Sequence, residues 1–237
     1  MKVLVLGASG ATGKLVALQL INRQINVRIV VRECATLPEE ILNNPLTEVT
    51  HGNISEFNDL DMENLVHGCN AIVSCLGHNI TMKGMFGKPR NLVVDTVKKV
   101  CNAVKKNSKT RLILMSTTAF LNNVKGEKYS TGENIIFSIL KFLLPPHLDN
   151  VMAANFLQTE ILEGIGNIEW VAVRPDTLFN EEVESAYEAC ESPIRSPVFN
   201  PGKVSRLNVS HFMADLLTDD VLWQKWRFKM PVLYNKI

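Results

Sequence analysis

The stretch Gly7-Ala8-Ser9-Gly10-Ala11-Thr12-Gly13 follows directly on the apolar run 3–6 and decides how the chain folds. The apolar run predicts a buried strand, and the apolar pattern that begins at Leu15 predicts a helix. A helix that begins on a glycine turn presents free backbone N–H groups and a positive dipole end to an anion. Gly7 permits the turn, Gly10 lets a pyrophosphate approach the main chain, and Gly13 lets helix and strand pack closely. We therefore expect a dinucleotide site here, the alternative being a glycine-rich turn without a ligand.

The composition excludes several classes of partner. A chain of 237 residues with 46% hydrophobic and 21% charged residues is typical of one globular domain. The net charge of +1 gives no electrostatic reason to expect nucleic acid or an anionic membrane as partner. No apolar run reaches the ~20 residues that span a bilayer, and the first one is too short for a signal peptide. We expect a cytoplasmic protein with a small-molecule substrate.

The cysteines and histidines give no sign of a disulfide framework or a metal site. The five cysteines are odd in number and scattered without a C-x-x-C pair, which is typical of reduced thiols. Cys75 falls in an apolar run and is expected to be a small core residue. The histidines show no ligand spacing, so no metal is expected.

Strand and helix patterns alternate over the first two-thirds of the chain. The strands are continuous apolar runs, as expected of parallel strands covered on both faces. A helix is predicted over Pro89–Lys106, and right-handed crossovers then give a doubly wound parallel sheet, a Rossmann fold of the α/β class. The predicted strands are Lys2–Leu6, Val27–Val31, Glu48–His51, Ala71–Cys75, Leu112–Met115 and Trp170–Val173.

The last part of the chain departs from this alternation, and we assign residues 176–237 of the single domain to a substrate-side region. The apolar segment Ile135–Leu144 follows a capping-box pattern and predicts a helix that is either packed into the core or part of a pocket wall or subunit contact. The proline-rich stretch Glu181–Pro201 predicts an irregular cover over the cleft. A helix over Ser210–Leu217 and an edge strand over Phe228–Tyr234 complete the prediction.

The choice between NAD and NADP is made where the second strand ends. A carboxylate at that place binds the ribose 2′-hydroxyl, whereas a guanidinium accommodates a 2′-phosphate. If the strand ends at Val31, Arg32 holds the deciding position and favours NADP over NAD. Counting ~20 residues from Gly13 reaches Glu33 instead, which leaves NAD open.

Further cofactor contacts are expected where the other strands end, because the crevice of a doubly wound sheet lies beyond the carboxyl ends of its strands. Asn53 and Ile54 follow the third strand, where an amide can bind the adenine. Leu76 and Gly77 follow the fourth strand, where glycine would let the backbone pass close to the cofactor. Ser116 and Thr117 follow the fifth strand.

These motifs together resemble the atypical short-chain dehydrogenase/reductases, and most of all their NmrA-like and biliverdin-IXβ/flavin reductase branch. The similarity covers nearly the whole chain, but only the cofactor half carries specific motifs. The resemblance implies a Rossmann fold that binds NAD(P), with Arg174-Pro175 near the nicotinamide. In the flavin reductase branch a hydroxyl near the nicotinamide matches Thr118, which implies a positioning role, the alternative being a threonine that caps a turn.

One departure from that family bears on the chemistry. Most short-chain dehydrogenases use a Tyr-x-x-x-Lys pair, in which lysine lowers the tyrosine pKa. Aligning Glu160 with the family's helix puts Met152 and Phe156 at those two positions. Carbonyl chemistry assisted by a phenol is therefore not expected, and His78 is either a general acid or a surface turn histidine.

Three functions remain open. The first is NADPH-dependent hydride transfer to a flat acceptor such as a flavin or quinone, since the cofactor itself carries that reaction. The second is a regulator that senses NADP(H) without catalysis, as the NmrA-like resemblance implies. The third is a nucleotide-sugar epimerase or dehydratase. The chain is expected to be a monomer or a homodimer, because Ile135–Leu144 and two tryptophans taken as exposed, Trp223 and Trp226, allow a dimer.

Overall fold

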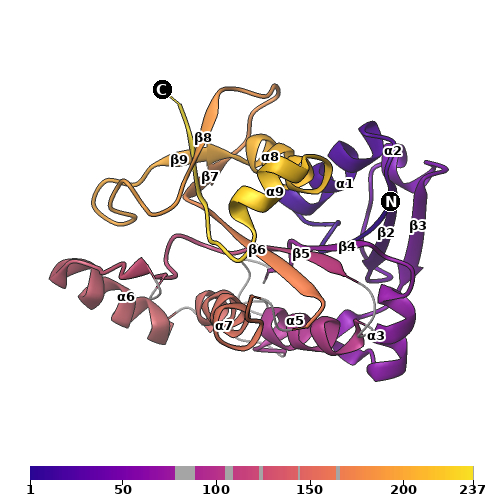
Figure 1. Cartoon of the computed structure of the whole chain (residues 1–237), viewed down its shortest axis with the longest axis horizontal. Helices are drawn as coiled ribbons and strands as arrows, with labels where there is room; N and C mark the ends of the chain where they lie inside the picture. Colours follow the sequence, from indigo (N-terminus) through magenta and orange to yellow (C-terminus); the bar gives the residue numbers. More distant parts are fainter. Residues whose placement is uncertain (78–88, 105–108, 123–124, 144, 164–165, 237) are drawn as a thin grey trace.

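The fold is built on one eight-stranded sheet in the order β3-β2-β1-β4-β5-β6-β10-β8 (Figure 1). The computed structural model describes residues 1–77, 89–104, 109–122, 125–143, 145–163 and 166–236. In this order the strands from β3 to β10 are parallel to one another, and β8 pairs antiparallel with β10. The strands are β1 (Lys2–Leu6), β2 (Asn26–Val31), β3 (Thr47–His51), β4 (Ala71–Ser74), β5 (Thr110–Met115), β6 (Ile168–Pro175), β8 (Tyr187–Cys190) and β10 (Val232–Asn235).

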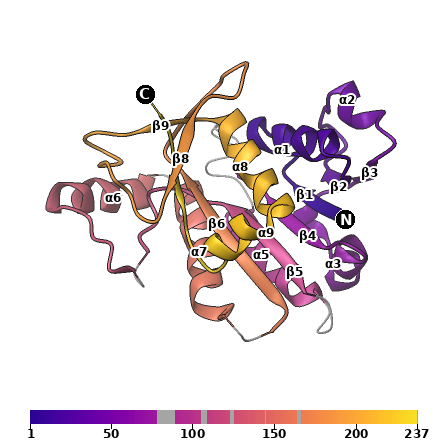
Figure 2. The same ribbon diagram turned by 45° about the horizontal axis from the view of Figure 1, so that its top comes forward.

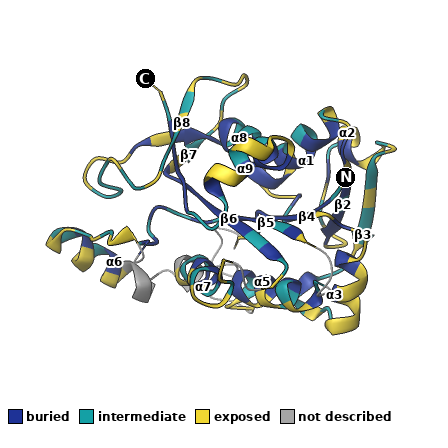
Figure 3. Cartoon of the chain, viewed as in Figure 1, coloured by how far each residue is buried: buried dark blue, intermediate teal, exposed yellow. Residues whose placement is uncertain are grey.

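Helices cover both faces of the sheet, because alternate residues of its apolar strands point to opposite sides. In β1, Val3 and Val5 pack with the helices of one face, and Leu4 and Leu6 pack with those of the other. The first face carries α1 (Ala11–Asn22), α8 (Arg206–Thr218) and α9 (Asp220–Trp226); the second carries α3 (Asp59–Val66), α5 (Leu92–Ala103) and α7 (Pro145–Glu160). Figure 3 shows the sheet buried between these two helical layers.

The doubly wound Rossmann fold predicted from the sequence is confirmed. All six predicted strands are present, each within two residues of its expected bounds, and α5 lies inside the predicted range Pro89–Lys106. The remaining elements are short: α2 (Glu39–Leu42), the 3-10 turn η1 (Ile54–Glu56) and a small parallel pair of β7 (Thr177–Phe179) and β9 (Lys203–Ser205). No helix among the described residues is long and apolar enough to cross a membrane.

Three expectations for the last part of the chain are wrong. The segment predicted as an edge strand forms β10, which lies between β6 and β8, so β8 is the strand at the edge. The proline-rich stretch that was expected to be irregular supplies β8, and Figure 2 shows β8 beside β10 above the end of β6. Trp223 and Trp226 are fully buried rather than exposed, because α9 turns both side chains against α8 and the sheet.

The predicted helix over Ile135–Leu144 forms as α6 (Thr131–Leu143), which lies to one side of the sheet in Figures 1 and 2. Its exposure differs from a core helix, since Phe137 is buried but Ile135 and Ile139 are more than half exposed. Glu133 closes the predicted capping box at its start by accepting bonds from Ser130 N and Oγ, both at 2.8 Å.

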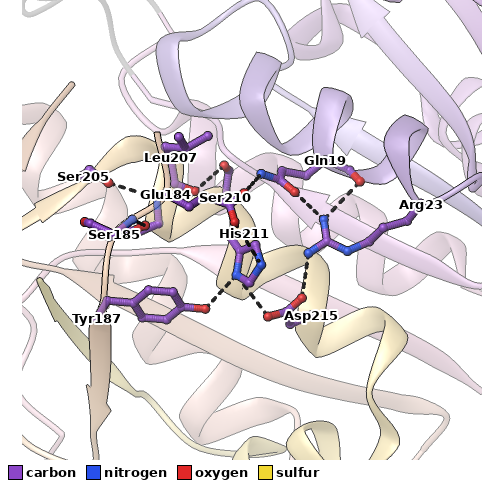
Figure 4. A network of polar contacts seen from close by, with 11 residues as sticks. Gln19, Arg23, Glu184, Ser185, Tyr187, Ser205, Leu207, Ser210, His211 and Asp215 are labelled. Atoms are coloured by element: carbon purple, nitrogen blue, oxygen red, sulfur yellow. Dashed lines mark hydrogen bonds and ion pairs between the residues drawn. The ribbon is translucent and has the colours of Figure 1, made fainter. Parts of the chain in front are cut away.

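A network of polar side chains holds residues 181–187 against the helical layer of α1 and α8 (Figure 4). His211 of α8 lies at its centre, with Nδ1 2.9 Å from the Tyr187 hydroxyl and 3.1 Å from Asp215 Oδ2. Its Nε2 is 3.4 Å from Glu184 Oε2, and Glu184 also accepts a bond of 2.6 Å from Gln19 of α1. The segment that precedes β8 is therefore tied to two helices.

Candidate functional site

The glycine turn between β1 and α1 has a geometry that only glycine permits at two positions. Gly7 has a φ of +79°, in the left-handed region, and a Cβ there would lie 2.6 Å from the Cys75 carbonyl oxygen. A Cβ on Gly13 would lie 2.1 Å from the Gly7 carbonyl oxygen. The turn is closed by a bond of 2.9 Å from Gly10 N to Gly7 O. The strand and helix are thus as close as a dinucleotide turn requires.

The first turn of α1 is open toward the carboxyl edge of the sheet. Its N-cap is Gly10, no side chain caps its N–H groups, and no acidic residue lies in this turn. Ser9, Gly10 and Ala11 are exposed, whereas Thr12 is buried. Backbone donors at the positive end of a helix dipole, with no side chain competing for them, suit a phosphate group.

Arg32 and Glu33 follow β2 at the same edge, and both are exposed. No hydrogen bond or ion pair of the Arg32 side chain is found within the described residues, so its guanidinium is open to a ligand. Glu33 instead faces the neighbouring strand, with Oε2 3.9 Å from His51 Nδ1. The two candidates for the ribose site therefore differ, since Glu33 has a partner among the described residues and Arg32 has none there.

The residues after β3 form a compact turn. Asn53 caps η1, with Oδ1 accepting a bond of 2.9 Å from Ser55 Oγ and Nδ2 donating a bond of 2.7 Å to Glu56. Ile54 is buried. Asn53 lies at the expected edge, and although its amide binds within the turn, donation to Glu56 uses one of the two N–H groups of Nδ2, so the second can donate to an adenine nitrogen.

The ends of β4 and β5 lie side by side at the centre of the sheet. Leu76 is half-buried and Gly77 is exposed, and a Cβ on Gly77 would meet no atom of the described residues within 4 Å. Ser116 Oγ is buried without a hydrogen-bond partner in the described part of the chain. Thr117 Oγ1 accepts a bond of 3.2 Å from Ala119 N. His78 lies outside the described residues.

Thr118, the candidate positioning residue, is buried. Its exposed fraction is 5%, and its carbonyl oxygen accepts a bond of 3.4 Å from the Tyr129 hydroxyl. Burial raises the pKa of Tyr129, so this phenol stays protonated at neutral pH. The structure thus places one protonated hydroxyl beside the backbone of Thr118.

Arg174 is committed to the protein interior rather than to an open crevice. Its guanidinium is fully buried, forms a bidentate ion pair with Glu127 at 2.7 and 2.9 Å, and donates to the carbonyl oxygens of Phe120, Met230 and Glu191. Although burial of Glu127 opposes ionisation, the bonds from Arg174 and from Asn122 N hold the Glu127 pKa below its ordinary value. Arg174 therefore fixes the loop after β5, while Pro175 ends β6.

A pocket of about 470 Å³ begins one residue beyond Thr118, between the loop after β5 and helices α5, α6 and α7. Met152 and Phe156, which stand at the positions of the family's Tyr-x-x-x-Lys pair, both line this pocket with apolar side chains. No sequence pattern points to Tyr129 or Phe137, whose rings pack in a tilted arrangement with centroids 4.4 Å apart. The side chains that shape the pocket are Phe120, Tyr129, Phe137, Met152, Phe156 and Lys98.

An NAD(P)-binding protein is the class that this fold and its glycine turn define. The chain belongs to the NAD(P)H-binding family, whose model matches residues 7–220. No curated protein matches the chain significantly in sequence. The resemblance to the atypical short-chain dehydrogenase/reductases is confirmed by this family and by the solved structures that share the fold.

Three of those solved structures illustrate the likeness. A short-chain dehydrogenase/reductase from Veillonella parvula in complex with NADP has a TM-score of 0.71 and 17% identity, covering 99% of this chain and 94% of that one. SP1627 from Streptococcus pneumoniae, described as a candidate NADH-flavin reductase, has a TM-score of 0.69 and 15% identity, covering 100% of both chains. ChuY, an anaerobillin reductase from Escherichia coli, has a TM-score of 0.69 and 15% identity, covering 99% and 97%. At these identities the likeness shows the fold alone.

Proposed function

We propose that this protein is an NADPH-dependent oxidoreductase that transfers hydride to a flat conjugated acceptor such as a flavin or quinone. The observation that carries the proposal is the aromatic pocket beyond Thr118, because a pocket lined by aromatic rings suits a planar conjugated ligand. Hydride transfer needs orientation of the cofactor and the acceptor more than it needs acid catalysis. The names of two structural neighbours, a flavin reductase and an anaerobillin reductase, agree with this class of reaction.

Within the proposal each part of the site has a separate task. The glycine turn and the first turn of α1 bind the pyrophosphate, and Arg32 binds the 2′-phosphate. Thr118 positions the nicotinamide end. The Tyr129 phenol is a protonated group that lines the pocket, and solvent is another proton source for a reduced flavin or quinone.

The test is the oxidation of NADPH by the purified protein across a panel of flavins and quinones. We expect turnover with at least one acceptor, and Phe156→Ala should raise KM for that acceptor while leaving the Kd of NADPH unchanged. Leu60→Ala on α3 is the matched control, because Leu60 is 65% exposed and lies outside the pocket. Absence of turnover with every acceptor contradicts the proposal.

A second candidate, a regulator that senses NADP(H), is favoured by the apolar Met152 and Phe156 at the positions of the missing acid pair. Such a protein would bind oxidised and reduced cofactor with unequal affinity and couple that difference to a protein partner. Titrations with NADP and NADPH, together with the acceptor panel, separate the two candidates. Equal affinities combined with turnover favour the reductase.

A further inference from the structure

His51 ends β3 at the same sheet edge as Arg32. Its Cα is paired in register with Val31, the last residue of β2, and Gly52 N continues this pairing with a bond of 2.9 Å to Val31 O. Residues paired in register point to the same face of a sheet. Val31 belongs to the core on the side of α1, so His51 projects toward the face whose helix begins at the glycine turn.

The imidazole is available to a ligand and has an acidic neighbour. The His51 side chain is 49% exposed, and its Nδ1 lies 3.9 Å from Glu33 Oε2. The other carboxylates near this strand are engaged elsewhere. Glu48 pairs with Lys2 and Arg28, each at 3.0 Å, and Glu56 accepts a bond of 2.7 Å from Asn53.

Arg32 and Glu33, which follow β2, and His51, which ends β3, therefore lie at the sheet edge where the ribose of a bound dinucleotide would lie. Arg32 carries a positive charge, and His51 carries one when it is protonated. Glu33 follows Arg32 in the sequence, and its Oε2 lies 3.9 Å from His51 Nδ1. A dianionic 2′-phosphate is attracted by these positive charges and repelled by Glu33. A ribose 2′-hydroxyl is uncharged, so these charges do not attract or repel it in this way, and it can donate a hydrogen bond to the Glu33 carboxylate.

We propose that His51 is a second 2′-phosphate ligand beside Arg32 and that its protonation makes the preference for NADPH over NADH depend on pH. This inference rests on the proposed use of NADPH. Without the 2′-phosphate, His51 pairs with the Glu33 carboxylate. When the 2′-phosphate is bound, protonated His51 donates a hydrogen bond to a phosphate oxygen instead. Histidine is the side chain whose charge changes between pH 5 and 8, so acidification strengthens the second contact.

The test measures Kd for NADPH and for NADH at about pH 6 and about pH 8, since histidine changes its charge between them. We expect the ratio of the two affinities to favour NADPH more strongly at the lower pH, by roughly fivefold for a partly exposed charged contact. The 2′-phosphate itself gains a proton near pH 6, which acts in the opposite direction. His51→Gln corrects for this, because its own pH profile contains only the phosphate term.

The variants give the proposal its discriminating outcomes. His51→Gln should remove the pH-dependent gain, Glu33→Gln should raise the preference for NADPH, and the exposed His67→Gln should match the wild type. Thermal unfolding of each variant checks that the fold is intact. The inference is overturned if Arg32→Gln abolishes the preference for NADPH over NADH while His51→Gln leaves it unchanged at both pH values. That outcome leaves the proposed function standing. Binding of neither cofactor overturns both.

Discussion

Arg174 and Glu127 form a buried bidentate ion pair that joins the end of β6 to the loop after β5. The same guanidinium also holds three backbone carbonyl oxygens, so all the N–H groups that its fork can offer have acceptors. Because Thr118 and the pocket residue Phe120 lie on that loop, this pair sets the shape of the proposed acceptor site.

Breaking this pair should destabilise the protein strongly. Glu127→Gln leaves the buried guanidinium without its counter-charge, and we expect a loss of about 3–5 kcal/mol in the free energy of unfolding, as for other buried pairs that lose one partner. Urea unfolding measures the loss. The control is Glu182→Gln, an exposed position. A loss below about 1 kcal/mol, the range of surface ion pairs, contradicts the prediction.

Gly13 in the first turn of α1 and Gly77 in the loop after β4 should respond differently to alanine. Gly13→Ala puts a Cβ against the Gly7 carbonyl, so the turn must open, and we expect both a lower Tm and loss of NADPH binding. The Cβ of Gly77→Ala meets no atom within 4 Å in the part of the chain that the structure describes, and the variant should leave Tm unchanged. If the cofactor passes close to Gly77, the Kd of NADPH rises in this variant; an unchanged Kd contradicts that contact.

Arg32→Gln should reduce the affinity for NADPH much more than the affinity for NADH. A charge-assisted bond to the 2′-phosphate contributes about 1.5–3 kcal/mol, which corresponds to a weakening of Kd of roughly tenfold to a hundredfold. Calorimetric titration with both cofactors measures it, with the exposed Lys203→Gln as control. An equal loss for both cofactors would show that Arg32 does not discriminate between them.

Glu133 should contribute stability that is lost in acid. The bonds from the Ser196 hydroxyl and from Ser130 lower the pKa of this carboxyl, outweighing the effect of its burial. A group whose pKa is lower in the folded state stabilises above the pKa of the unfolded chain, about 4.5, and loses that contribution as pH falls through the folded pKa.

Glu133→Gln should therefore lower stability at neutral pH by about 1 kcal/mol, a typical capping contribution, and weaken the acid dependence of unfolding. Urea midpoints between neutral pH and about pH 3 measure both effects. Parallel pH profiles for the variant and the wild type would contradict the assignment.

The sequence predicts the cofactor half of this protein well because local and global signals agree there. A glycine turn has a strict backbone requirement, which Gly7 meets with its positive φ, and parallel strands are continuous apolar runs that stand out in the sequence. The place of Arg32 follows from where β2 ends, and the structure ends β2 at Val31, as expected.

The rest depends on contacts that sequence patterns do not carry. Trp223 and Trp226 sit among charged residues of a seven-residue helix, so their burial against α8 is visible only in three dimensions, where Trp223 also donates to Glu169. The position of β10 between β6 and β8 depends on pairing between segments that are far apart in the sequence. The buried ion pair of Arg174 is likewise a long-range contact, because its partner Glu127 is 47 residues away in sequence.

The position of β10 inside the sheet also orders the events of folding. Residues 232–235 are synthesised some forty residues after β8, yet among the described strands β8 pairs with β10 alone. During synthesis the edge of β6 that pairs with β10 must therefore keep its backbone groups unpaired until β10 has been made.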